Sequence, residues 1–200
     1  MPTGFLSGGT IVDRKSVKVG DQNFTEFVKG WPKDFDVVFF AGIREGALIL
    51  KEMRAQGLTQ LFSCGDGCWD TKAFILAAEG AATKGEGVLV LSAAPALGSV
   101  PGSAEFAARY TAKYGPINNY AASSYDAARM LMTAIAEAAK GKPTTPSRAE
   151  VVTALRTMTF QGIAYVKPVR WTEKGDNTAA VIFVNVVEDD HFNEIDRISN

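Results

Sequence analysis

Residues 35–41 read Phe-Asp-Val-Val-Phe-Phe-Ala, a run of β-branched and aromatic side chains with one polar interruption. Such a run suits a parallel strand that is buried on both faces of its sheet. Residues 44–56 follow with apolar side chains at helical spacing, and Gly57 is placed to end that helix. A buried strand joined by a short link to an amphipathic helix predicts one unit of an α/β fold.

The same alternation of strands and helices extends over the first 92 residues. The other expected elements are strands at 60–64 and 87–91, a helix at 71–79 capped by Asp70, a helix from the capping Asp21 to about Lys29, and a short strand candidate at 10–12. Strands and helices that alternate with short links predict a Rossmann-like parallel sheet with helices on both faces.

The pattern changes after residue 92. A connector of small residues, 93–102, leads to three predicted helices at 103–113, 120–140 and 147–158. The third helix opens with a capping box, Ser147 to Glu150. The remaining expected elements are a strand-like segment at 163–171 broken by Pro168, a turn at 172–176, a strong strand at 179–187 and an acidic tail.

This order of elements predicts two lobes. Residues 8–92 together with 179–190 form an α/β domain, and residues 103–171 form part of an incomplete, mostly helical lobe. Crossings between the lobes are expected near 93–102 and 172–178. Three amphipathic helices with little sheet of their own need a partner surface.

Charge and composition exclude several classes of function. Lys and Arg total 21 against 22 Asp and Glu, so no basic excess points to nucleic acid or an anionic membrane. Two Cys and one His, His191, exclude a disulfide framework, a four-Cys zinc site and a His-rich metal site. The sequence shows no phosphate-binding loop and no supported Ser-His-Asp arrangement, so we expect neither an enzyme nor a cofactor.

Two further expectations concern the chain ends and the cysteines. The N-terminal residues lack a basic and apolar leader, and no run of 18 apolar residues occurs, so we expect no signal peptide and no membrane span. Cys64 and Cys68 are spaced as CxxxC, which allows either a redox pair or two buried thiols. Because the spacing differs from the CxxC of oxidoreductases, it favours buried thiols.

The candidate site follows from where the parallel strands end. Ligands of open α/β sheets sit beyond the carboxyl ends of the strands, and these ends deliver Ile43 and Arg44, then Gly65 and Asp66, then Ser92 and Ala93. A carboxylate between two glycines suits a ligand ammonium group. The alternative is a turn aspartate that bonds its own backbone.

Two neighbouring side chains have open roles. Arg44 could bind a carboxylate, although a solvated residue in the first helical turn is the more common role. Trp69 could form the wall of a pocket or pack under the loop.

Several segments, taken in order, resemble one known family. They are the runs at 36–42, 50–58, 114–116, 125–128, 134–135, 160–162 and 171–176. They are similar to the type I periplasmic solute-binding proteins, specifically the group that serves ABC transporters of the branched-chain amino acids leucine, isoleucine and valine. The match runs from about residue 9 to 188 and covers only the C-terminal part of the family, so most of the first lobe is missing.

The resemblance implies a function as well as a fold. It implies a periplasmic, non-catalytic component that binds a small amino acid between two lobes and delivers it to a transporter permease. Asp66 falls where the family carries the acidic residue that binds the α-amino group. Gly65, Ile43, Arg44 and Trp69 are the other candidate ligand-binding residues. The alternative is a fragment that no longer binds ligand and associates into a homodimer through its uncovered surfaces.

Overall fold

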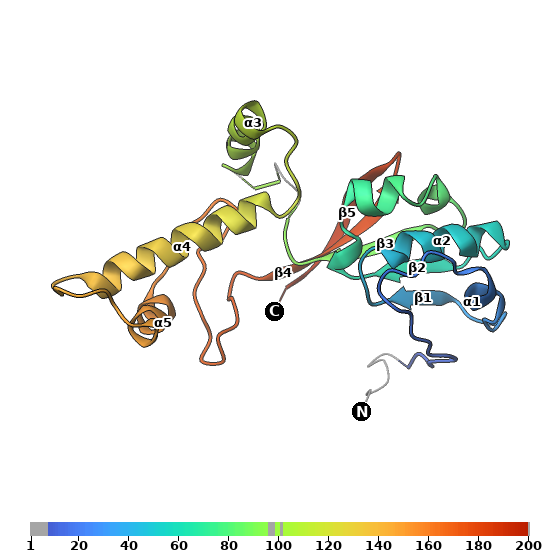
Figure 1. Cartoon of the computed structure of the whole chain (residues 1–200), viewed down its shortest axis with the longest axis horizontal. Coiled ribbons are helices and arrows are strands. Elements are labelled where there is room, and N and C mark those ends of the chain that lie inside the picture. The colour runs from blue at the N-terminus through green and yellow to red at the C-terminus, as the bar shows by residue number, and fades with distance from the viewer. Residues whose placement is uncertain (1–7, 96–98, 101, 200) are drawn as a thin grey trace. The chain divides into compact units, whose positions relative to one another are not determined.

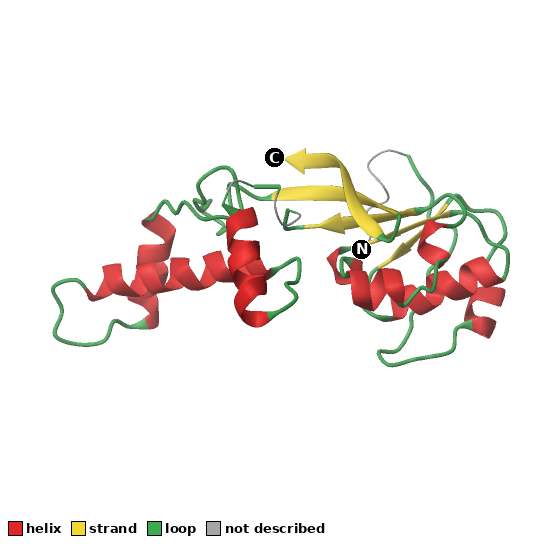
Figure 2. Ribbon diagram, turned by 90° about the horizontal axis from the view of Figure 1, so that it is seen from above, coloured by secondary structure: helices red, strands yellow, loops and turns green. Residues whose placement is uncertain are grey.

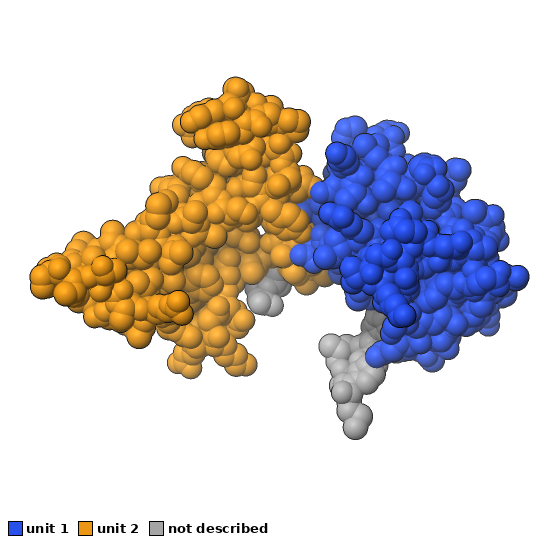
Figure 3. Space-filling view, viewed as in Figure 1, with its two compact units in different colours: residues 1–91, 184–195 blue, residues 92–183, 196–200 orange. Residues whose placement is uncertain are grey.

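A computed structural model describes residues 8–95, 99–100 and 102–199. The chain divides into two compact units, residues 1–91 with 184–195 and residues 92–183 with 196–200 (Figure 3). The N-terminal segment that was expected to lack a leader lies partly outside the described residues, at 1–7. Residues 96–98 and 101 of the expected connector also lie outside them.

A five-stranded sheet organises the first unit (Figure 1). Its strands are β1 (Val37–Phe40), β2 (Leu61–Cys64), β3 (Val88–Ser92), β4 (Val181–Glu188) and β5 (His191–Ser199), in that spatial order. β1 pairs with β2 and β2 with β3, both in parallel. The α/β prediction and the strands expected at 35–41, 60–64 and 87–91 are therefore confirmed, but β1 is an edge strand and is not buried on both faces.

The two faces of this sheet differ. The register places Phe40, Phe62 and Cys64 on one face, where all three are buried. Helices α1 (Thr25–Lys29) and α2 (Glu45–Ala55) and the π-helical turn η2 (Thr71–Leu76) lie on one side of the strands in Figure 2. On the opposite face of β1, Val37 is 42% exposed and Phe39 57% exposed. Helices were expected on both faces, but the described residues cover only one.

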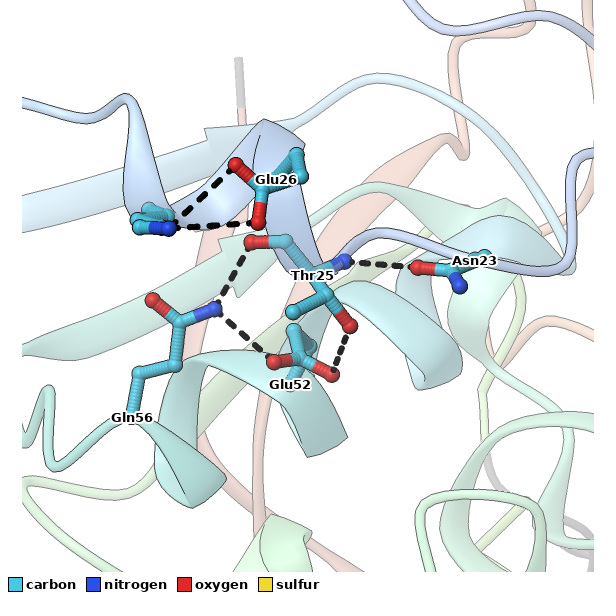
Figure 4. A network of polar contacts seen from close by, with 6 residues as sticks. Asn23, Thr25, Glu26, Glu52 and Gln56 are labelled. Atoms are coloured by element: carbon cyan, nitrogen blue, oxygen red, sulfur yellow. Dashed lines mark hydrogen bonds and ion pairs between the residues drawn. The ribbon is translucent and has the colours of Figure 1, made fainter.

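Aromatic stacking and polar contacts hold the helices to this sheet. Phe62 stacks on Phe40 and on Phe74 of η2, with ring centroids 6.4 and 6.2 Å apart. Between α1 and α2, Thr25 Oγ1 donates to Glu52 Oε2 at 3.2 Å (Figure 4). Gln56 Nε2 donates to both Thr25 O and Glu52 Oε1 at 2.8 Å. These contacts fix the short α1 against α2.

Arg54, at the end of α2, binds the loops that start two strands. Its Nη1 donates to Leu58 O at 2.8 Å and to Gln60 O at 2.9 Å, and its Nη2 donates to Gly87 O at 3.2 Å. Leu58 O and Gln60 O thereby gain a donor, and Gly87 O, which also accepts the N–H of Phe62, gains a second one. Burial lowers the pKa of this guanidinium from its usual value.

Three sequence expectations are corrected here. Residues 10–12 form no strand, because the exposed Ile11 and Val12 pair with no neighbouring strand. Residues 163–171 contribute only two isolated bridges, Val169 with Phe160 and Trp171 with Asn177, and Pro168 cannot donate to a ladder. The expected acidic tail is instead strand β5, joined to β4 by Asp189 and Asp190 at φ 48° and 60°. A two-residue turn of this kind makes the pair antiparallel.

The second unit is mainly helical. Its helices are α3 (Ser103–Tyr114), α4 (Ala121–Ala139) and α5 (Arg148–Thr157), and Ser147 and Glu150 form the predicted capping box. Met130, Phe160, Val169 and Ala179 form its core cluster. Leu131, Met132 and Ile135 of α4 are exposed. No helix among the described residues is long and apolar enough to cross a membrane.

Asp126 ties α4 to the segment after α5. This residue is buried, and its Oδ2 accepts the backbone N–H of Ile163 and of Ala164, both at 2.7 Å. Charge-assisted hydrogen bonds of this kind are stronger than neutral ones. Burial is the main cause that raises the pKa of Tyr165, and the charge of the Asp126 carboxylate raises it further.

Candidate ligand-binding edge

The loops that follow β1 and β2 lie against each other at the carboxyl edge of the sheet. A β-carbon built on Gly67 would lie 2.2 Å from Gly42 O and 3.0 Å from Ile43 Cγ1. The Cys68 thiol donates to Ile43 O at 3.9 Å. The parallel pairing of the two strands therefore brings Ile43 next to the loop that carries Asp66, and only glycine fits at position 67.

The loop after β2 is closed by its own backbone. It forms a short 3-10 turn, η1 (Asp66–Cys68), in which Cys68 N donates to Gly65 O at 3.1 Å. Trp69 N donates to Asp66 O at 3.0 Å. These bonds occupy the main chain of Asp66, while its side chain lies at the exposed surface of the loop. The carboxylate is therefore presented on a fixed turn.

Exposure separates the five candidate residues into two groups. Ile43 is 62% exposed, Arg44 and Asp66 are exposed, and Gly65 is half-buried. Trp69 is only 2% exposed, so its indole is buried. Arg44 takes the N-cap position of α2 with helical backbone angles. Ile43, Arg44 and Asp66 thus leave one apolar, one cationic and one anionic residue exposed on neighbouring loops, and Trp69 is buried.

Glu45, next to Arg44, joins this edge to a distant part of the chain. It was assigned no role from the sequence. It is buried at the start of α2, and its Oε1 accepts the backbone N–H of Gly20 at 2.8 Å. That hydrogen bond is the main reason why the pKa of Glu45 is lowered. An acidic residue in the first turn of a helix was the available signal, but its partner lies 25 positions away.

The third strand end contributes differently. Ser92 closes β3 and is buried, and its Oγ donates to the nearby carbonyl of Ala94 at 3.1 Å. Its hydroxyl is therefore engaged in a local turn. Ala93, the other residue expected here, accepts a hydrogen bond on its carbonyl from Tyr165 at 3.2 Å.

Other hollows and polar clusters lie elsewhere. A cavity of about 410 Å³ is lined by Thr83, Val187, Glu188, Asp189 and Asp190. Thr83 lies just before β3 begins, so this cavity belongs to the edge opposite the candidate site. Within the described ranges, no group of three or more His, Cys, Asp or Glu residues could hold a metal ion.

Comparison with known proteins identifies the type of scaffold. A family model described as "Periplasmic binding protein" matches residues 6–191. Among solved structures, a leucine binding protein LivK from Thermotoga maritima is 26% identical, with a TM-score of 0.73, and the match covers 92% of this chain and 50% of that one. Among curated proteins, no relative is found.

Two further structures share the fold at lower identity. LivJ from Streptococcus pneumoniae, a branched-chain amino acid transporter substrate binding protein in complex with isoleucine, is 22% identical with a TM-score of 0.70, over 91% of this chain and 50% of that one. A fatty acid ABC transporter substrate-binding protein from Thermomonospora curvata is 19% identical with a TM-score of 0.73, over 92% and 49%. The chain thus spans about half the length of these proteins.

Proposed function

Because this chain belongs to the periplasmic binding protein family, we propose that it binds a small branched-chain amino acid at the edge of the sheet where β1 and β2 end. Members of the family bind solutes and in general perform no chemistry. We extend both properties to this chain: it holds leucine, isoleucine or valine and leaves the ligand unchanged.

The observation that carries the proposal is the fixed position of Asp66. Its carboxylate stands exposed on a turn that is closed by its own backbone and pressed against Ile43. A ligand ammonium group would bind this carboxylate through charge-assisted hydrogen bonds. A β-carbon built on Gly65 meets nothing within 4 Å, which leaves room for a ligand to approach the backbone.

The other candidate residues complete the ligand chemistry. Ile43 offers an exposed apolar contact for an aliphatic side chain. Arg44, on the same loop as Ile43, offers a donor for the ligand carboxylate. Trp69 is buried. An amphoteric ligand with a short branched side chain matches this set of one anion, one cation and one apolar group.

The wider setting follows the same proposal. The T. maritima relative is described as a leucine binding protein. We assign the chain, on that basis, to amino acid uptake in the periplasm, with a transporter permease as the partner that receives the ligand.

Calorimetry with analogues of leucine tests the proposal. Leucine, isoleucine and valine are titrated into the 200-residue chain, alongside 3-methylbutylamine, which lacks the carboxylate, and 4-methylpentanoate, which lacks the amino group. If Asp66 binds the ammonium group, leucine binds best, the amine binds more weakly and the acid gives no heat. Absence of heat with all three amino acids would overturn the assignment, as would binding of palmitate in their place.

A second candidate function rests on uncovered apolar surface. Val37 and Phe39 are exposed on β1, which is an edge strand, and Leu131, Met132 and Ile135 are exposed on α4. Exposed apolar patches and free strand edges favour association with a second copy. Light scattering over a range of concentrations tests this: a dimer that dissociates in Phe39→Ser supports self-association, and a monomer at high concentration rejects it.

A further inference from the structure

Cys64 and Cys68 lie together beneath the candidate ligand-binding edge. Cys64 is the last residue of β2 and Cys68 the last residue of η1, and both are fully buried. The neighbouring Cys68 thiol, and then burial, raise the pKa of Cys64. The Cys68 thiol also reaches Ile43 O on the neighbouring loop. The fold therefore buries two cysteines at the two ends of the short loop that carries Asp66.

We propose that Cys64 and Cys68 form a disulfide site whose bond closes the Gly65–Gly67 loop into a covalent ring. Disulfides require close and correctly directed β-carbons. Cys64 lies opposite Phe40 in the strand register, and a β-carbon built on Gly46 would lie 2.8 Å from Phe40 Cδ1 and 3.0 Å from Cys68 Sγ, so both cysteines border the same buried ring. Gly65 and Gly67 supply the backbone freedom that so small a ring needs. The inference goes beyond ligand binding, and it uses the proposed function only in that Asp66 sits on the ring.

The chemistry is a thiol–disulfide exchange with a small disulfide such as oxidised glutathione. The thiolate of one cysteine attacks the oxidant, which forms a mixed disulfide and releases one glutathione thiol. The second cysteine then attacks the protein-bound sulfur, forms the Cys64–Cys68 bond and releases the second glutathione. The protein loses two protons and two electrons, and the glutathione disulfide gains both.

Burial decides when this exchange occurs. Neither thiol is accessible in the folded chain, and the raised pKa of Cys64 disfavours its thiolate. The bond therefore forms before the loop closes or while it is open. The periplasm, where the family works, is a compartment in which disulfides form and persist.

Alkylation after oxidative refolding tests the site. The full chain is unfolded, refolded with oxidised or with reduced glutathione, unfolded again and treated with N-ethylmaleimide, and its intact mass is measured. We expect the oxidised sample to remain monomeric without reductant and to take up no alkyl group, whereas the reduced sample takes up two. We also expect the oxidised form to melt about 5 °C higher. Two free thiols after oxidative refolding, or a disulfide-linked dimer, would overturn the proposal.

Single variants provide the matched controls. Cys64→Ala and Cys68→Ala each leave one thiol, so their melting temperatures are expected not to differ between oxidised and reduced samples. A redox-dependent shift that persists in either variant would contradict the assignment. Alkylation of the unmodified chain gives its answer even if a variant fails to fold. Failure of amino acid binding would show in calorimetry and not in these masses, so the two proposals fail independently.

Discussion

Gly162 lies so close to the Asp126 carboxylate that a β-carbon at position 162 would stand 2.0 Å from Asp126 Oδ2. The same oxygen accepts the N–H groups of the next two residues along the chain. The close approach of the Gly162 backbone and the two hydrogen bonds are therefore one arrangement, which joins α4 to the segment after α5.

Gly162→Ala is expected to destabilise the second unit strongly. Backbone or helix must shift to relieve the overlap, and two buried hydrogen bonds are lost, so we expect a loss of about 3 kcal/mol or more. Gly30→Ala is the control, because the atoms nearest to its β-carbon lie at ordinary contact distances of 3.5 Å and beyond. Urea unfolding followed by circular dichroism measures the difference. Equal stability of the two variants would contradict the account.

Arg54→Ala is expected to weaken the first unit. The substitution removes this donor from the carbonyls of Leu58 and Gln60 and leaves Gly87 O with only the N–H of Phe62, at a cost of about 2–4 kcal/mol. Arg54→Lys retains the charge but not the planar fork, so it recovers only part of the loss. Arg109→Ala removes an exposed arginine with one long ion pair and is expected to cost less than about 0.5 kcal/mol. Chemical unfolding curves rank the three variants, and similar midpoints for Arg54→Ala and Arg109→Ala would refute this role.

Asp66→Asn is expected to weaken leucine binding by about 10- to 100-fold, because a charge-assisted hydrogen bond to the ligand ammonium is lost. The melting temperature of each variant is measured alongside, so that a loss of binding is not mistaken for a loss of folding. Asp34→Asn removes a charge from another exposed position of the same unit and serves as the control. Calorimetry with leucine distinguishes them, and unchanged affinity in Asp66→Asn would remove Asp66 from the site.

The lowered pKa of Glu150 predicts that stability depends on pH only under acidic conditions. Hydrogen bonds from Lys142 and then from Ser147 lower its pKa to about 2, against an ordinary value of 4.5. Because the folded-state value is the lower one, the stabilisation is present above 4.5 and is lost as the pH falls towards about 2. Since the carboxylate is fully solvated, the effect concerns the local stability of α5.

An NMR titration of the Glu150 carboxyl measures this directly. We expect a midpoint of about 2 in the unmodified chain. In Lys142→Met, which removes the largest cause, the midpoint should move up towards 4.5. A midpoint near 4.5 before any substitution would show that the Lys142 contact at 2.6 Å does not persist in solution.

The elements that sequence reasoning found are those with local signals. β1 follows from its unbroken β-branched and aromatic run, and α2 follows from helical spacing that ends at Gly57, whose φ is +78°. The capping box of α5 depends on residues three positions apart. Each pattern is complete within a dozen residues, so tertiary contacts were not needed to find it.

β5 was missed because its signal is not local. Its residues are mostly polar, and only pairing with β4 makes them a strand. The turn is Asp189-Asp190 in place of the Asn-Gly or Asp-Gly that marks most two-residue hairpins. Its apolar residues Phe192, Ile195 and Ile198 recur at every third position, so the alternation that marks a half-buried strand is absent from the sequence.

The candidate site was predictable in its placement and not in its packing. The rule that ligands lie beyond strand ends brought Ile43 and Asp66 onto neighbouring loops, and Gly67 does lie against Ile43. The burial of Trp69 depends on tertiary packing of its loop. The hydrogen bond between Glu45 and Gly20 joins positions that are 25 residues apart. Neither leaves a periodic trace in the sequence.

The half-covered sheet has a practical consequence for fluorescence measurements. Dyes such as ANS become fluorescent on apolar surface and are commonly used to detect molten states. With Val37 and Phe39 open on one face of β1, the native chain itself offers such a surface. Dye emission will therefore start high and rise little on heating, and circular dichroism will report the melting of this chain more faithfully.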